Sequence, residues 1–171
     1  MTVFFLRLNP LDRTKAMLEG CGLKLRCAIG RSGVITRKRE GDGGTPRATL
    51  TPLRIYVRLD QWRIRSFNFP SYAIQSDMGW CDDVTSSRYN RMIRIPFALS
   101  HEKLWREDHL YDIVIETDWN AQPAIRGMGS AIFIHLARPG LKPTEGCIAL
   151  SRKDMSLFLT YLNRRTKIII T

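Results

Sequence analysis

The sequence contains no long hydrophobic run, no CxxC pair and only three histidines. No stretch approaches the roughly 18 apolar residues of a membrane-spanning helix, so we expect no transmembrane segment. The four cysteines, Cys21, Cys27, Cys81 and Cys147, are too widely spaced for a zinc or redox motif. The histidines are too few and too scattered for a metal cluster. These absences predict a soluble protein that needs no metal and no cofactor.

The first residues also lack the pattern of an ordinary export signal. The segment MTVFFLRLNPLDR has a short apolar run, but no basic region precedes it and no small-residue cleavage site follows. This pattern predicts a first β-strand. If the protein acts outside the cytoplasm, its export signal has been removed, lies outside this sequence or is of another kind.

Length and composition fit one globular domain over residues 1–171, with 44% hydrophobic and 25% charged residues. The net charge of +11 attracts acidic polymers, anionic surfaces or carboxylate-bearing substrates. The basic residues are scattered, and the chain has no RNP-type aromatic motif, zinc-finger spacing or heptad-linked basic helix. We therefore expect no nucleic-acid partner. The alternative to an enzyme is a basic β-domain that binds nucleic acid or another acidic polymer and catalyses no reaction.

Short apolar and β-branched segments predict a mainly β fold. Expected strands cover residues 2–8, 22–29, 34–37, 53–62, 92–97, 110–116, 131–138, 147–150 and 167–171. The turn Gly30-Arg31-Ser32-Gly33 predicts a hairpin between the second and third of these strands. Residues 38–49 predict an exposed loop, and residues 66–90 predict an irregular, partly packed segment.

Two segments carry helix signals. Ser100 as N-cap, with Glu102 in the first turn, predicts a short helix. Ser151 and Asp154 form a capping box that opens a helix through about Asn163. Four apolar residues lie on one face of that helix: Met155, Phe158, Leu159 and Leu162. The fold class we expect is a β-sandwich or barrel with one or two packed helices.

The segment GSAIFIHLARPGLKPTEGCIALSRKDM predicts a reactive site. It places His135 in an apolar strand and Cys147 at the start of the next strand, so their side chains can lie next to each other. A free thiol is mostly protonated at neutral pH, and a neighbouring imidazole can take its proton and hold the thiolate as an ion pair. Gly146 lets a carbonyl approach the backbone, where the N–H groups of Glu145, Gly146 and Cys147 can face an oxyanion.

Other interpretations exist for these residues. A single cysteine or histidine in an apolar strand is more often part of the core. Cys81 is a rival nucleophile, although Asp82 and Asp83 would raise the pKa of its thiol. Ser130 is a candidate to orient His135, but on a regular strand it faces the opposite side, so we favour a backbone carbonyl.

A strand ending in His135, followed by Thr-x-Gly-Cys-Ile, resembles the YkuD-type L,D-transpeptidases of bacterial peptidoglycan. The loop GDGGTPRATL resembles the acidic-Gly-Thr-Pro segment of that family, and GWCDD, RYNR, WREDHLYD and RGMGSAIFIHLARPG resemble a compact proteobacterial branch. The similarity covers roughly residues 22–170. The chain has Glu145, Ala149 and Leu136 where many members have His, Arg and Gly or Ser.

The resemblance implies a YkuD-like fold and a cysteine L,D-transpeptidase. Cys147 would attack the carbonyl between diaminopimelate and the terminal D-Ala of a stem tetrapeptide, and His135 would protonate the departing D-Ala. Capture of the thioester by another stem peptide makes a crosslink, whereas capture by water makes an L,D-carboxypeptidase. The resemblance also implies peptidoglycan stem peptides as partners and a location in the periplasm or cell envelope, and we expect a monomer.

Candidate substrate contacts complete this hypothesis. The catalytic set is Cys147, His135 and Gly146, and the substrate-binding set is Thr144, Glu145, Arg152, Arg138, Trp80, Tyr89 and Asn90. The arginines suit substrate carboxylates because a guanidinium makes a forked contact. Solvated surface arginines and ordinary loop packing are the alternatives for these residues.

Overall fold

The structure, a computed structural model, describes residues 1–63 and 68–171, so residues 66 and 67 of the expected irregular segment lie outside the described part. The chain is mainly β, as predicted. The elements are β1 Thr2–Asn9, β2 Asp12–Gly20, β3 Leu23–Ala28, β4 Val34–Ile35, β5 Thr45–Pro46, β6 Thr49–Leu50, β7 Pro52–Val57, β8 Ser71–Ala73, β9 Met78–Cys81, β10 Arg91–Arg94, β11 His101–Lys103, β12 Ile113–Thr117, β13 Phe133–Leu136, β14 Ile148–Leu150, α1 Arg152–Tyr161 and β15 Thr166–Ile170.

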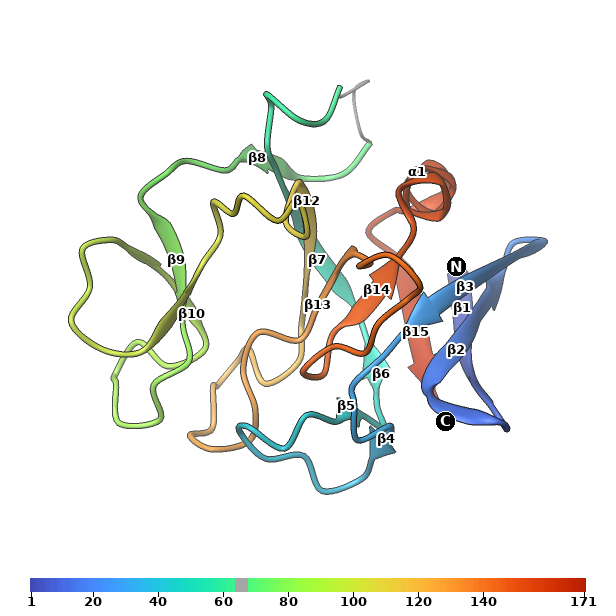
Figure 1. The fold of residues 1–171 in the computed structure, drawn as a ribbon, viewed down its shortest axis with the longest axis horizontal. Coiled ribbons are helices and arrows are strands. Elements are labelled where there is room, and N and C mark those ends of the chain that lie inside the picture. Colours follow the sequence, from blue (N-terminus) through green and yellow to red (C-terminus); the bar gives the residue numbers. More distant parts are fainter. Residues whose placement is uncertain (64–67) are drawn as a thin grey trace.

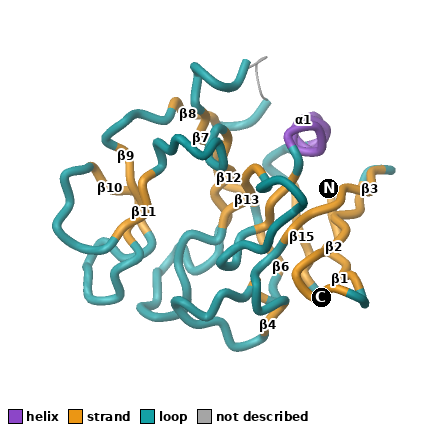
Figure 2. Tube along the Cα trace, in the orientation of Figure 1, coloured by secondary structure: helices purple, strands orange, loops and turns teal. Residues whose placement is uncertain are grey.

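A ten-stranded sheet forms most of the fold (Figure 1). Its strand order is β6-β15-β1-β2-β3-β14-β13-β12-β7-β8. The strands β13 and β14, which carry the expected site, lie in the centre of this order and pair in parallel. The other sheets are small, with the orders β10-β9-β11 and β4-β5. Long loops join many of these elements (Figure 2).

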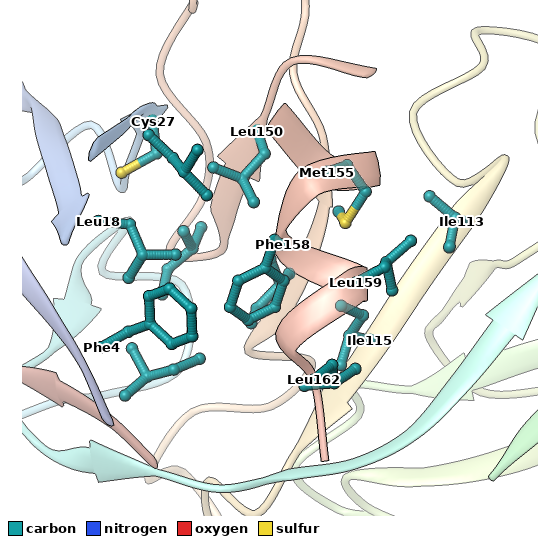
Figure 3. Close-up of a cluster of buried hydrophobic side chains, with 14 of the residues drawn as sticks. Phe4, Leu18, Cys27, Ile113, Ile115, Leu150, Met155, Phe158, Leu159 and Leu162 are labelled. Atoms are coloured by element: carbon teal, nitrogen blue, oxygen red, sulfur yellow. The ribbon is translucent and has the colours of Figure 1, made fainter. Parts of the chain in front are cut away.

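The first hydrophobic core lies between α1 and one face of the ten-stranded sheet (Figure 3). The N-cap Ser151 accepts a hydrogen bond from the Asp154 N–H at 3.0 Å, as the capping box predicts. Phe158 of α1 packs edge-on against Phe4 of β1, with ring centroids 5.0 Å apart. The buried face of α1 is the predicted one, and it includes Met155 and Leu159. Burial of this face fixes the helix against the sheet.

A second core lies on the opposite face of the central strands. There Tyr56 of β7, Val114 of β12 and Phe133 of β13 pack with Trp80 of β9. The Trp80 and Phe133 rings meet edge to face, with centroids 5.0 Å apart. This second core contains Cys147. The small sheet β10-β9-β11 therefore packs against the face of the ten-stranded sheet that carries the thiol.

Several local predictions are wrong because tertiary pairing overrides short-range signals. The expected hairpin before β4 does not form, since β4 pairs in parallel with β5, and β3 pairs with β2 and β14. The expected helix after Ser100 is the strand β11, whose residue Glu102 pairs with Trp80 of β9. An isolated short helix is marginal, whereas a strand gains partners here. The strand β2 was not predicted.

The expected exposed loop at 38–49 is largely packed, which corrects the prediction from its glycines and charges. Thr45 is fully buried, and the Lys38 side chain is buried against Asp42 with Nζ and Oδ1 2.5 Å apart. Asp42 also accepts the Gly44 N–H at 2.9 Å. Burial of these polar groups is tolerated because each has a partner. The segment therefore supports the neighbouring loops instead of extending into solvent.

Candidate active site

The register of β13 and β14 places His135 and Cys147 on the same face of the sheet. His135 pairs with Ala149, and Cys147 lies two residues before Ala149. Side chains on a strand alternate between faces, so residues two apart share a face. Ile134 and Ile148, the alternate residues, belong to the first core, whereas Cys147 belongs to the second. The fold therefore brings together the two residues that the sequence singled out.

Both side chains line a surface cleft of about 270 Å³. Its lining residues are Glu102, Arg106, Leu110, Tyr111, His135, Arg138, Lys142, Pro143, Thr144, Glu145, Cys147 and Ala149. Cys147 is 8% exposed and His135 is 6% exposed, so each is held by the fold but reaches the cleft. A peptide end can therefore approach the thiol from solvent.

A backbone carbonyl orients His135, as we favoured over Ser130. The Nδ1 atom lies 2.8 Å from the carbonyl oxygen of Leu136. A carbonyl oxygen only accepts hydrogen bonds, so Nδ1 carries the proton in the neutral ring. The Nε2 atom then keeps its lone pair, which is the form of imidazole that can act as a base. The Tyr111 ring packs edge-on against the imidazole, with centroids 5.2 Å apart.

The thiol of Cys147 is held by the start of the neighbouring strand. Its Sγ donates to the carbonyl of Ala131 at 3.0 Å and accepts the N–H of Phe133 at 3.3 Å. Burial, followed by the charge of Glu102, raises the pKa of Cys147 to about 12. Burial also lowers the pKa of His135 to about 4. Both shifts favour a neutral thiol beside a neutral imidazole over an ion pair.

The buried imidazole predicts a pH-dependent stability. Between the folded pKa of about 4 and the ordinary 6.5, the unfolded chain binds the additional proton, so the free energy of unfolding rises with pH. This contribution is complete above 6.5 and is lost as the pH falls through the folded value. From pH 4 to pH 7, we expect the free energy of unfolding of the wild type to rise by about 3 kcal/mol more than that of His135→Gln, because the glutamine side chain does not titrate. Urea unfolding of both proteins measures this, and a constant difference across the range would contradict it.

The turn before Cys147 is fixed by the segment at residues 38–49. The Thr45 hydroxyl donates to the carbonyl of Gly146 at 2.8 Å and accepts the Gly30 N–H at 2.9 Å. Thr144 Oγ1 donates to the Cys147 carbonyl at 2.7 Å and accepts the Gly146 N–H at 3.1 Å. The Gly146 N–H is thus already bonded, which removes one of the three expected oxyanion donors. Glu145 and Cys147 are the remaining candidates.

Gly146 is required by close packing and by its backbone angle. Its φ is +138°, and an added Cβ would lie 2.7 Å from the carbonyl oxygen of Gly44. Side chains with a Cβ rarely adopt this φ, and the carbonyl cannot move without disturbing the buried segment around Thr45. The need for glycine here therefore comes from the packing of two loops.

The expected substrate contacts separate into two groups. Arg138, Thr144 and Glu145 line the cleft, and the exposed Glu145 pairs with Arg31 at 2.9 Å. Arg152 does not line it. Its guanidinium forms an ion pair with the buried carboxylate of Asp112. Because this ion pair compensates the buried charge of Asp112, the geometry favours a role for Arg152 in stabilising the fold. It does not support the expected contact with substrate.

Trp80, Tyr89 and Asn90 also lie away from the cleft lining. Trp80 Nε1 donates to Asn90 Oδ1 at 2.9 Å, and the same oxygen accepts the N–H of Ala131 at 3.0 Å. Ala131 in turn provides the carbonyl that the Cys147 thiol contacts. Tyr89 donates to Glu40 at 2.5 Å. All three residues are buried and outside the cleft lining, so the structure places them in the wall behind the thiol.

The other cysteines do not line the cleft. Cys81 is fully buried in β9, Cys27 is fully buried in β3, and Cys21 is exposed in the turn between β2 and β3. The residues described contain no group of three or more His, Cys, Asp or Glu side chains able to hold a metal ion. Within that same part of the chain, no helix is both long and apolar enough to cross a membrane.

Among the cleft-lining residues without a predicted site role, four have polar side chains: Glu102, Arg106, Tyr111 and Lys142. Tyr111, in the turn before β12, donates to Glu102 of β11 at 2.7 Å. Arg106 forms an ion pair with Asp108 at 2.5 Å, and its guanidinium lies 5.0 Å from the centre of the Tyr111 ring. The motif WREDHLYD contains two of them, but nothing in its spacing shows that they face the thiol.

The sequence matches the YkuD family, described as the L,D-transpeptidase catalytic domain, over residues 12–170. The match covers nearly the whole chain and includes β13, which carries His135, and Cys147 directly before β14. The chain therefore belongs to the YkuD L,D-transpeptidase family. A search of curated proteins finds no match to this sequence.

Proposed function

We propose that this protein is a cysteine L,D-transpeptidase that crosslinks peptidoglycan stem peptides in the cell envelope through a thioester on Cys147. The observation that carries this proposal is the placement of His135 and Cys147 on one face of adjacent strands, in one cleft open to solvent. Membership of the YkuD family supports the reaction class. The imidazole, with its proton on Nδ1, suits the role of base toward the thiol.

The first half of the reaction forms the thioester. As Sγ of Cys147 bonds to the carbonyl carbon of diaminopimelate, its proton passes to Nε2 of His135. The bond to the nitrogen of D-Ala then breaks, and the imidazolium returns the proton to that nitrogen. Because burial favours the neutral pair, proton transfer accompanies the attack instead of preceding it. The Phe133 N–H stabilises negative charge on the sulfur at 3.3 Å.

The second half releases the acyl group to an amine. A neutral amine of another stem peptide attacks the thioester carbon, the bond to Sγ breaks, and the amine proton reaches Sγ through His135. Arg138 and Lys142 line the cleft and are exposed, so they can contact the carboxylates of the two stem peptides. Capture by water instead would give the L,D-carboxypeptidase product.

Mass spectrometry of reaction products tests the proposal. Purified protein incubated with disaccharide tetrapeptides is expected to release D-Ala and form dimers joined through diaminopimelate. An adduct on the intact protein, equal to the donor minus D-Ala, would show the thioester. Tripeptides without dimers would establish the carboxypeptidase instead. A folded protein that releases no D-Ala from any stem peptide would overturn the proposal and favour the non-catalytic basic domain.

A further inference from the structure

Glu102 lines the cleft that contains the Cys147 thiol. A carboxylate at this position opposes ionisation of the thiol, because it disfavours a second negative charge nearby. The residue belongs to β11, in the small sheet, and lines the cleft together with Cys147. One oxygen, Oε2, accepts the Tyr111 hydroxyl at 2.7 Å. The Tyr111 ring is itself held against His135. The carboxylate is thus held by a ring that packs against the imidazole, and its charge acts on the Cys147 thiol.

Among the residues that the structure describes, no cation forms an ion pair with Glu102. Burial, together with the nearby charges of Asp82 and Glu40, raises the pKa of this carboxyl, while Tyr111 and Arg106 act in the other direction. Arg106 makes two hydrogen bonds to Asp108, at 2.9 Å and 2.5 Å, so its charge is already shared. A carboxylate in such a place is stabilised most by a cation that enters the cleft.

We propose that Glu102 binds a positively charged amino group of the peptide substrate and so selects donors whose third residue carries a free side-chain amine. This inference rests on the proposed function, because it concerns the same cleft. The amino group would lie between the carboxylate and the thiol, where it forms a charge-assisted hydrogen bond. Its charge would also offset the effect of Glu102 on the sulfur, so the thiol is activated when a donor is bound.

The donor, and not the acceptor, fits this position. An acceptor amine attacks the thioester only when it is neutral, and a neighbouring carboxylate favours the protonated form. Glu102 would therefore slow an attacking amine that it bound directly. The side-chain amine of the donor's diaminopimelate takes no part in the bond changes and can stay charged throughout. Glu102 is accordingly a specificity-determining residue for the donor.

Binding measurements in a Cys147→Ala background test the inference without turnover. Calorimetry compares a tetrapeptide carrying free diaminopimelate with the same peptide acetylated on the side-chain amine. Glu102→Gln removes the charge while its amide oxygen can still accept the Tyr111 hydroxyl. We expect this substitution to weaken binding of the free-amine peptide by about tenfold to a hundredfold and to leave the acetylated peptide unchanged. Glu107→Gln, an exposed change of the same charge nearby, should alter neither affinity.

The outcomes separate this inference from the proposed function. Equal weakening for both peptides would show that Glu102 only maintains the shape of the cleft, and unchanged affinity for both would show that it contacts neither. Either result overturns the inference even if the wild type forms dimers. Conversely, selective weakening supports it even if the bound donor is never crosslinked. Thermal unfolding of each variant identifies any loss of folded protein.

Discussion

Replacing Cys147 with alanine is expected to lower the rate of D-Ala release by at least about a thousandfold, because no other thiol reaches the cleft. The donor adduct should disappear from the intact-mass spectrum at the same time. Cys147→Ser should be nearly as inactive, since a hydroxyl can keep the contacts with Ala131 and Phe133 but is a far weaker nucleophile. Product release and adduct formation are measured on the same samples.

Cys27→Ala is the matched control for this loss. Like Cys147, Cys27 is buried, donates its thiol to a backbone carbonyl, that of Ala16 at 3.3 Å, and has a pKa raised to about 12 by burial. It lies in the first core, outside the cleft. Its substitution should lower stability but retain turnover, and the same holds for Cys81→Ala. Full turnover by the Cys147→Ala protein would refute the proposed nucleophile.

Gly146→Ala is expected to destabilise the fold by about 2–4 kcal/mol and to abolish most of the activity. Two costs add at this position. The φ of +138° is unfavourable for alanine, and the new Cβ would meet the Gly44 carbonyl at 2.7 Å. Relief of that clash must displace either the turn that carries Cys147 or the segment held by Thr45. Urea unfolding and D-Ala release measure the two effects.

Gly140→Ala separates the backbone cost from the clash. Gly140 has a φ of +74°, and nothing lies within 4 Å of an added Cβ. Its substitution should therefore cost only about 1 kcal/mol, the penalty for a left-handed residue with a side chain. Activity should be nearly unchanged because Gly140 is exposed and does not line the cleft. Equal destabilisation by both substitutions would argue against the packing role of Gly146.

The sequence by itself determined the features that depend on neighbouring residues. The Ser151 cap and the apolar face of α1 follow from local spacing, and both are confirmed. The motif from His135 to Cys147 identified the family, which the match over residues 12–170 confirms. The two adjacent strands of that motif also predicted that the imidazole and the thiol can lie next to each other, and the register of β13 and β14 places them on one face. The mainly β class is also confirmed, and it follows from short apolar and β-branched segments along the sequence.

Only the tertiary structure decided how distant segments surround the thiol. Thr45 contacts Gly146, which lies far away in the sequence, and Glu102 of β11 contacts Tyr111 in the turn before β12. The strand β11 forms because β9 is there to pair with it, although the local signal favours a helix. Likewise, burial raises the pKa of Cys147 and lowers the pKa of His135. Long-range pairing and desolvation depend on every neighbour in space, and local spacing carries no record of them.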